Sequence, residues 1–158
     1  MKKFLNILAA MLLTVISTSC LDSNLEELEV YSGCEVTQGY VYWRWITNDV
    51  HPGSEDNYVK QTEMTYSGGG GHSLDKVNQK LIIRYHGGYV ATSERPNIDA
   101  SKLVVALQVS TAAIVKPVGD APKLGAPGDW TKEHQYDVIA ADGTTKRWTI
   151  GVLRHDAQ

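Results

Sequence analysis

Two cysteines are the most nucleophilic side chains in this chain of 158 residues, and they stand in different contexts. Cys20 directly follows the small residues Ser17, Thr18 and Ser19 at the end of an apolar run. Cys34 has no histidine at a spacing that would mark a thiol nucleophile. We therefore expect chemistry at Cys20, and we predict that Cys34 is a small buried apolar residue, as most free cysteines are.

The N-terminal segment has the three parts of a secretory signal peptide. Two lysines give it a positive start, residues 4–16 form an apolar run, and residues 17–19 are small. The run is too short to span a membrane, because a transmembrane helix needs about 20 apolar residues; a buried N-terminal helix is the alternative. The segment resembles a bacterial lipoprotein signal, although Ser17 stands where leucine is commonest. The resemblance implies that residues 1–19 are removed and that the thiol of Cys20 is acylated.

Four acidic residues occur in the stretch 20–29, which follows the predicted cleavage site. They resemble the export signals of surface lipoproteins in the Bacteroidetes. We therefore expect a lipidated cysteine and an acidic tether that anchor the protein in the outer membrane, at the cell surface. Without Lys2 and Lys3 the formal net charge falls from −3 to −5. Because no basic stripe could follow a phosphate backbone, nucleic acid is not an expected partner.

The other residues that could bind a metal or a phosphate lack the required spacing. The five histidines are scattered, which predicts surface positions and no metal site. They are His51, His72, His86, His134 and His155. Residues 68–71 are four glycines without the Lys-Ser/Thr of a P-loop, which favours a flexible hairpin tip. The oxygen-rich positions 48–49 and 55–57 lack the alternating acids and central glycine of a calcium loop. We predict neither a metal nor a cofactor.

Aromatic residues give the one indication of a ligand surface. Tyr40, Tyr42 and Arg44 occupy alternate positions of a predicted strand, and Trp130 lies in a loop rich in proline and glycine. Sugars stack their apolar faces on flat rings, while charged and amide side chains bind the hydroxyl groups. These four residues are therefore candidate glycan-binding residues. The alternative is that the tyrosines and Arg44 form an ordinary exposed sheet face.

Strands must position these residues. Residues 36–46 alternate with period two, which places Val41, Trp43 and Trp45 inward and the tyrosines outward. Further strands are predicted at 59–66, 80–86, 103–110, 136–141 and 146–153. No amphipathic helix of ordinary length is predicted between them. Short strands separated by turn signals indicate one all-β domain over residues 30–158, an antiparallel sandwich of two sheets.

One hairpin can be predicted in detail from its apolar residues. Asp142-Gly143 suggests a two-residue turn, but that register would place the apolar residues of the two strands on opposite faces. A slip of one residue pairs Val138 with Trp148 and Tyr136 with Ile150, so that all four share a face. We therefore predict a loop of three or five residues, with Gly143 available for a positive φ.

The segment from Ile98 to Val152 resembles a known family. Its motifs are KPVG at 116–119, GDW at 128–130 and YDVIAADGTTKRWTI at 136–150. They resemble the immunoglobulin-like domains of unknown function that are common in Bacteroidetes surface lipoproteins, often near polysaccharide-utilisation modules. The resemblance implies an immunoglobulin-like antiparallel β-sandwich and brings no established catalytic residues.

Two functions therefore remain open. A non-catalytic accessory lipoprotein would capture or present glycan at the cell surface, and this hypothesis predicts saturable binding of a polysaccharide. A structural or interaction module would instead dock onto another outer-membrane protein and would have no affinity for sugar. An enzyme is not expected, because no nucleophile, pair of carboxylates or metal cluster stands out.

Overall fold

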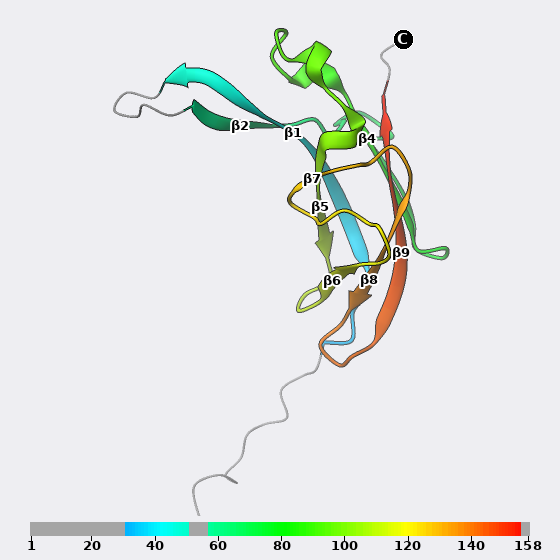
Figure 1. Cartoon of the computed structure of the whole chain (residues 1–158). Coiled ribbons are helices and arrows are strands. Elements are labelled where there is room, and N and C mark those ends of the chain that lie inside the picture. Colours follow the sequence, from blue (N-terminus) through cyan, green and yellow to red (C-terminus); the bar gives the residue numbers. More distant parts are fainter. Residues whose placement is uncertain (1–30, 51–56, 156–158) are drawn as a thin grey trace, which may run out of the picture. The chain divides into compact units, whose positions relative to one another are not determined.

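Nine β-strands form the regular structure of the described residues, 31–50 and 57–155, in this computed structural model (Figure 1). Their bounds are β1 Val36–Val50, β2 Asn57–Glu63, β3 His72–Asp75, β4 Lys80–Tyr85, β5 Leu103–Val109, β6 Ile114–Pro117, β7 Pro127–Gly128, β8 His134–Ile139 and β9 Thr145–Arg154. Three 3-10 helices lie between β4 and β5: η2 Gly87–Tyr89, η3 Arg95–Asn97 and η4 Ala100–Lys102. The prediction of an all-β chain is confirmed for these residues, whose helices are too short to cross a membrane.

The strands form two sheets. Sheet A has the order β2-β1-β5-β7, and sheet B has the order β3-β4-β9-β8-β6. Neighbouring strands are antiparallel except β4 and β9, which run parallel from the pair Lys80/Thr149 to the pair Tyr85/Arg154. The prediction of purely antiparallel pairing is wrong for this pair. The sequence gives no signal for it, because the two strands are far apart in the chain. β3, β6 and β7 were not predicted, since strands of two to four residues are too short to show alternation.

The buried faces of the two sheets share one core. On β1, Val41 and Trp43 are buried and Trp45 is partly buried against the core, as the period-two pattern predicts. Sheet B contributes the buried side chains Leu81, Ile83, Tyr136, Val138, Trp148 and Ile150. Removing a large apolar side chain from water contributes about 1.5–3 kcal/mol. The core therefore fixes which face of β1 points away from it.

The β8–β9 hairpin confirms the predicted face but not the predicted pairs. Tyr136, Val138, Trp148 and Ile150 are all buried on one face. Tyr136 lies opposite Trp148, however, and Val138 lies opposite Lys146, so the pairing differs from the prediction by two residues. A shift of two residues keeps every side chain on its face, and for that reason the apolar pattern cannot detect it.

The loop of this hairpin explains the register. The amide of Ala140 donates to the carbonyl oxygen of Thr144 (2.8 Å), which closes a three-residue loop at residues 141–143. Gly143 has a φ of 87°, and Asp142 Oδ1 accepts a hydrogen bond from the amide of Thr144 (2.8 Å). Three-residue hairpin loops commonly end in a residue with positive φ. The predicted loop length of three and the positive φ of Gly143 are confirmed, but the loop is centred on Asp142, whereas the predicted pairs would centre it on Gly143.

After β2 the chain passes from sheet A to sheet B. The amide of Met64 still donates to the carbonyl of Val41 (2.7 Å), but Thr65 pairs with Tyr85 beside β4. β2 therefore pairs with β1 only from Tyr42 onward, whereas β5 pairs with residues 36–42 of β1 on the other side. Among the described strands of sheet A, none covers the remaining edge of β1, and the candidate site lies at that edge.

Candidate functional site: a polar cavity beside β1

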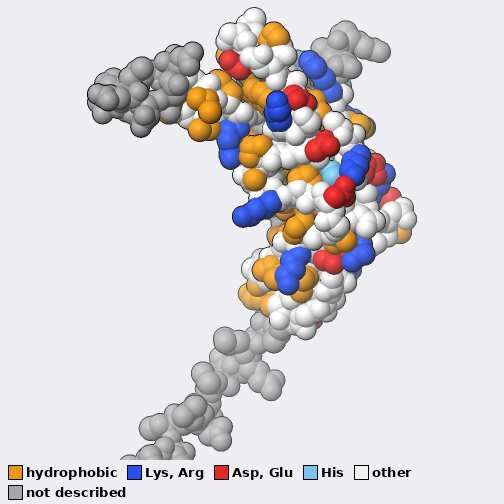
Figure 2. Space-filling model, in the orientation of Figure 1, with side chains coloured by type: hydrophobic (Ala, Val, Ile, Leu, Met, Phe, Trp, Pro, Cys, Tyr) orange, Lys and Arg blue, Asp and Glu red, His pale blue; other side chains and the backbone are white. Residues whose placement is uncertain are grey.

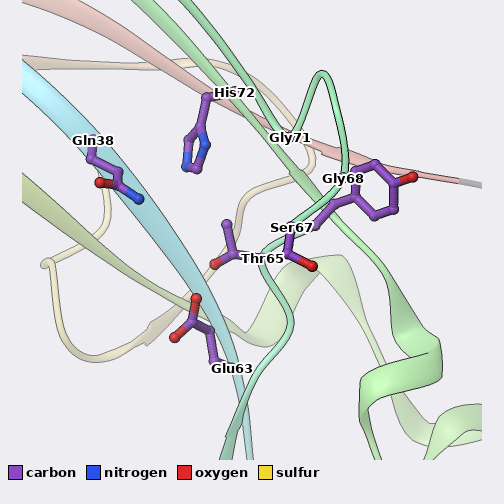
Figure 3. A pocket seen from close by; sticks show the side chains of 8 residues that line it. Gln38, Glu63, Thr65, Ser67, Gly68, Gly71 and His72 are labelled. Carbon is purple, nitrogen blue, oxygen red and sulfur yellow. The ribbon is translucent and has the colours of Figure 1, made fainter.

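A cavity of about 310 Å³ lies beside the first half of β1, next to the edge that β2 leaves uncovered (Figure 3). The lining comes from β1, the end of β2 and the segment that leads into β3. The lining residues are Gln38, Glu63, Thr65, Tyr66, Ser67, Gly68, Gly71 and His72. All except the two glycines carry hydrogen-bonding side chains. The cavity is therefore suited to a small polar ligand.

Side chains satisfy the backbone at this edge of β1. Thr65 Oγ1 accepts a hydrogen bond from the amide of Val41 (2.9 Å). The Nε2 atom of His72 lies 2.5 Å from the carbonyl oxygen of Gly39. A carbonyl oxygen can only accept, so Nε2 carries the proton and Nδ1 of the neutral ring is an acceptor. The two side chains take the place of a strand and leave a cavity where a strand would lie.

The glycine run forms one wall of the cavity and is not a hairpin tip. Thr65 pairs with Tyr85, and His72 pairs with Ile83 on β4. The chain therefore runs along β4 before and after residues 67–71, which form a loop between the two pairs; we call this loop the glycine excursion. The excursion is tightly held. The amide of Gly71 donates to Gly68 O (3.1 Å), and Arg84 Nη1 donates to Gly70 O (2.6 Å). The expectation of a hairpin tip is therefore wrong, because the chain pairs with the β4 region both before and after this segment.

Two of the predicted candidate residues adjoin the cavity on the outward face of β1. Tyr40 and Tyr42 are partly exposed, with ring centroids 6.5 Å apart. Gln38 continues the same alternating row into the cavity, and Glu63 lies directly opposite Tyr42 on β2. Partial burial, with the charge of Glu63 and then Tyr40 adding to it, raises the pKa of Tyr42. The phenol therefore stays protonated at neutral pH and can both donate and accept.

Arg44 is on this face but is engaged by neighbouring groups. Its Nε and Nη2 atoms donate to Gln61 Oε1, at 2.9 and 2.6 Å. Nη2 also lies 3.3 Å from the carbonyl oxygen of Gly125. A ligand would have to displace these bonds to use the guanidinium, so Arg44 is better placed to hold the loop at Gly125 beside sheet A.

Trp130 is in the core, which corrects its prediction as an exposed sugar-binding residue. Its side chain is 1% exposed, and its ring stacks on Tyr136 with the centroids 6.0 Å apart. The amide of Trp130 donates to Ala100 O (2.9 Å), and the Tyr136 hydroxyl donates to Pro122 O (2.6 Å). These bonds fold the proline-rich loop over the core. A buried indole offers no face to a sugar.

The four histidines of the described residues lie in three environments. His134 is 4% exposed, with Nε2 bonded to Asp129 O (2.7 Å), so the predicted surface position is wrong for this residue. His155 stacks on Tyr66 at 3.9 Å, and His86 lies 6.4 Å from His155 between ring centroids. His72 lines the cavity. Within the described ranges, no group of three or more His, Cys, Asp or Glu side chains could hold a metal.

The prediction for Cys34 is confirmed, because the thiol is free and the residue is 2% exposed. Other predicted positions lie outside the described residues. These are the segment 1–19, Cys20, the tether 20–29, His51 and the side chains at 48–49 and 55–57.

Sequence reasoning missed most of the cavity. Gln38 could have been found, since it shares the alternation of Tyr40 and Tyr42. Glu63 and His72 could not, because their positions depend on the pairing register and on the change of sheet after β2. No local sequence signal specifies either feature.

The fold and the site define an all-β domain of two sheets with a polar cavity at one strand edge. The chain belongs to the DUF5018-related family, whose model matches residues 36–151. No curated protein matches the sequence.

Solved structures that are similar to this chain include two Bacteroides proteins. A Bacteroides fragilis NCTC 9343 protein, described as a "putative secreted protein", has 34% identity and a TM-score of 0.68, and the match covers 78% of this chain and 97% of that one. A Bacteroides thetaiotaomicron protein, described as a "putative glycoside hydrolase", has 24% identity and a TM-score of 0.36 over 51% of this chain and 20% of that one. The second likeness is too slight to support an argument about activity.

Proposed function

We propose that this protein is a lipid-anchored surface module with an immunoglobulin-like sandwich that captures glycan without cleaving it. The observation that carries the proposal is the polar cavity beside β1 and its continuation into the row of Tyr40 and Tyr42. Sugars require hydrogen-bonding groups for their hydroxyls and a flat apolar surface for their ring faces. The cavity provides the former, and the tyrosines provide the latter.

The size of the cavity favours one sugar ring at a time. Ligand pockets range over roughly 300–1,000 Å³, and a volume of about 310 Å³ is at the small end. A longer glycan would place one residue in the cavity and its neighbours over the tyrosines. In this arrangement Gln38 and Glu63 bind hydroxyl groups in the cavity, and Tyr42 stacks on the adjacent ring.

The side chains of the cavity support capture without cleavage. Glycoside hydrolysis normally requires two carboxyl groups, roughly 5–9.5 Å apart. Glu63 is the single carboxylate in the lining. A site with one acidic group and several amide, hydroxyl and imidazole groups is suited to binding.

The proposed location rests on the sequence and on one relative. The signal-like segment 1–19 and Cys20 support export and lipid attachment. The similar Bacteroides fragilis protein carries a description as secreted, which agrees with export. We therefore place the domain in the outer membrane at the cell surface, held there by the acyl chains on Cys20.

A second candidate function is docking onto another outer-membrane protein. Residues 42–50 of β1 pair with β2, residues 57–63, and together they form an arm that extends away from sheet B (Figure 1). Ile46 and Val59 lie directly opposite each other on this arm, with 70% and 58% of each residue exposed. Figure 2 shows hydrophobic side chains gathered near this end of the molecule. An exposed apolar pair of this kind fits a protein contact.

The test is affinity electrophoresis of residues 21–158 through gels that contain plant, host or microbial polysaccharides. We expect at least one glycan to retard the protein, and Gln38→Ala to abolish the retardation. Gln135→Ala is the matched control, because Gln135 is exposed on β8 in the other sheet. If no glycan retards the protein, glycan capture is excluded and docking through the arm becomes the leading function.

A further inference from the structure

The cavity contains an anionic hydrogen-bond acceptor and no lysine or arginine. The carboxylate of Glu63 can only accept, and Nε2 of His72 is bonded to Gly39 O, so Nδ1 is the ring nitrogen that remains for a ligand. Figure 3 shows the His72 ring extending from β3 toward the side chains of Gln38 and Thr65. Hydrogen-bond donors on a ligand, such as hydroxyl groups, therefore match these two positions.

The lining also contains hydrogen-bond donors, and these are uncharged. Thr65 Oγ1 already accepts from the Val41 amide, so its own hydroxyl hydrogen remains to be donated. Ser67 shares a hydrogen bond with the hydroxyl of Tyr89 (3.1 Å). Gln38 adds one amide group. These groups can bind hydroxyl oxygens, but they cannot neutralise an anion.

No lysine or arginine lines the cavity, and two arginines of the surrounding strands have their guanidinium groups bonded to protein oxygens. Arg84 donates to the carbonyl of Gly70, on the glycine excursion. Arg44 donates to Gln61. The one formal charge in the lining is therefore the carboxylate of Glu63, which repels a second carboxylate brought close to it.

We infer that the cavity selects uncharged sugars over acidic sugars, with Glu63 as the residue that determines this specificity. The inference rests on the proposed glycan capture and names its ligand class. A neutral sugar ring donates its hydroxyls to Glu63 and to Nδ1 of His72. A uronic acid of the same shape has a carboxylate in place of one hydroxymethyl group. Glu63 repels this carboxylate, and no lysine or arginine in the lining neutralises it.

The test compares a neutral and an acidic polymer with the same linkage, so that the pair differs in the carboxylate alone. Mannan is compared with polymannuronate by calorimetric titration of the full chain in detergent. We expect the neutral polymer of the pair to bind at least about tenfold more tightly, the ratio expected for like charges a few ångströms apart at a partly solvated site. Glu63→Gln keeps the size and hydrogen-bonding positions of the side chain, and it should bring the two affinities within about threefold.

Each outcome bears on a different claim. Equal binding of neutral and acidic polymers by the wild-type chain, or preference for the acidic one, overturns the inference and leaves glycan capture intact. A preference for neutral polymers that Glu63→Gln does not reduce overturns the role of Glu63. Binding of no polymer overturns both the inference and the proposed function. Glu63 is exposed, so a thermal melt of Glu63→Gln should match that of the wild type.

Discussion

Tyr42 and Tyr136 have the same side chain and opposite roles. Tyr42 lies on the outward face of β1 next to Glu63, where its hydroxyl is available to a ligand. Tyr136 is fully buried, and its hydroxyl donates to Pro122 O (2.6 Å). The first residue belongs to the proposed site, whereas the second holds the proline-rich loop against the core.

Burial raises the pKa of Tyr136 well above its ordinary value. The folded chain therefore keeps this proton at a pH where the unfolded chain loses it. The contribution to stability is complete below about pH 10 and is lost as the pH rises from there toward the raised pKa of the folded state. Urea unfolding from pH 8 to pH 11 should show the free energy of unfolding falling above pH 10 by up to about 1.4 kcal/mol per pH unit from this group.

Tyr136→Phe isolates this effect. The variant lacks the hydrogen bond to Pro122 O, so at pH 8 its free energy of unfolding should be lower by about 0.5–1.5 kcal/mol. Above pH 10 its stability should fall less steeply than that of the wild type, since the titrating group is gone. Parallel curves for the two proteins over this range would show that Tyr136 does not titrate with folding.

At the scale of elements, the glycine excursion at residues 67–71 sets the shape of the cavity. A Cβ atom on Gly71 would lie 1.9 Å from the carbonyl oxygen of Tyr66, too close for any side chain. Gly69 has nothing within 4 Å of the corresponding position. Gly71 lines the cavity and Gly69 does not, so the two glycines give a matched pair of substitutions in one segment.

Gly71→Ala should displace this segment. We expect the free energy of unfolding to fall by about 1–3 kcal/mol, the usual cost of forcing extra atoms into a packed site. We also expect glycan retardation to be lost. Gly69→Ala should change stability by less than about 0.5 kcal/mol and leave binding as it is. If Gly71→Ala binds glycan like the wild type, the excursion does not form part of the site.

Elements with strong alternation were predictable, and elements defined by long-range pairing were not. The alternation of Val41, Trp43 and Trp45 identified the face of β1 that points to the core. The alternating apolar residues of β8 and β9 identified the buried face that these two strands share. The parallel contact of β4 with β9 has no signal within either strand. The change of sheet at Thr65 depends on hydrogen bonds to a distant strand, so the cavity that it creates could not be predicted.

The tryptophan at position 130 illustrates the same limit. Its surroundings in the sequence, rich in proline and glycine, indicated an exposed loop. In the fold this loop is drawn inward by contacts with residues 100 and 136, which lie on other elements. Composition gives the type of segment, but long-range contacts determine its burial.

At the scale of the whole molecule, we propose that a lipid anchor on Cys20 holds a glycan-binding domain at the cell surface. Incubation of expressing cells with labelled palmitate should label the protein, and Cys20→Ser should abolish the label, because the serine hydroxyl is not a thiol acceptor for the lipid. Cys34→Ser is the matched control and should keep the label. A label that survives in Cys20→Ser and disappears in Cys34→Ser would exclude the proposed anchor.

The most direct test of the central claim is a residue-resolved NMR titration of the soluble domain with a polysaccharide fragment that retards it in gels. The account predicts that amide shifts change with saturation at Gln38, Tyr42, Glu63, Gly71 and His72, the residues around the cavity. Shifts confined to the arm around Ile46 and Val59, or shifts on the far side of sheet B, would contradict the account and place the ligand elsewhere.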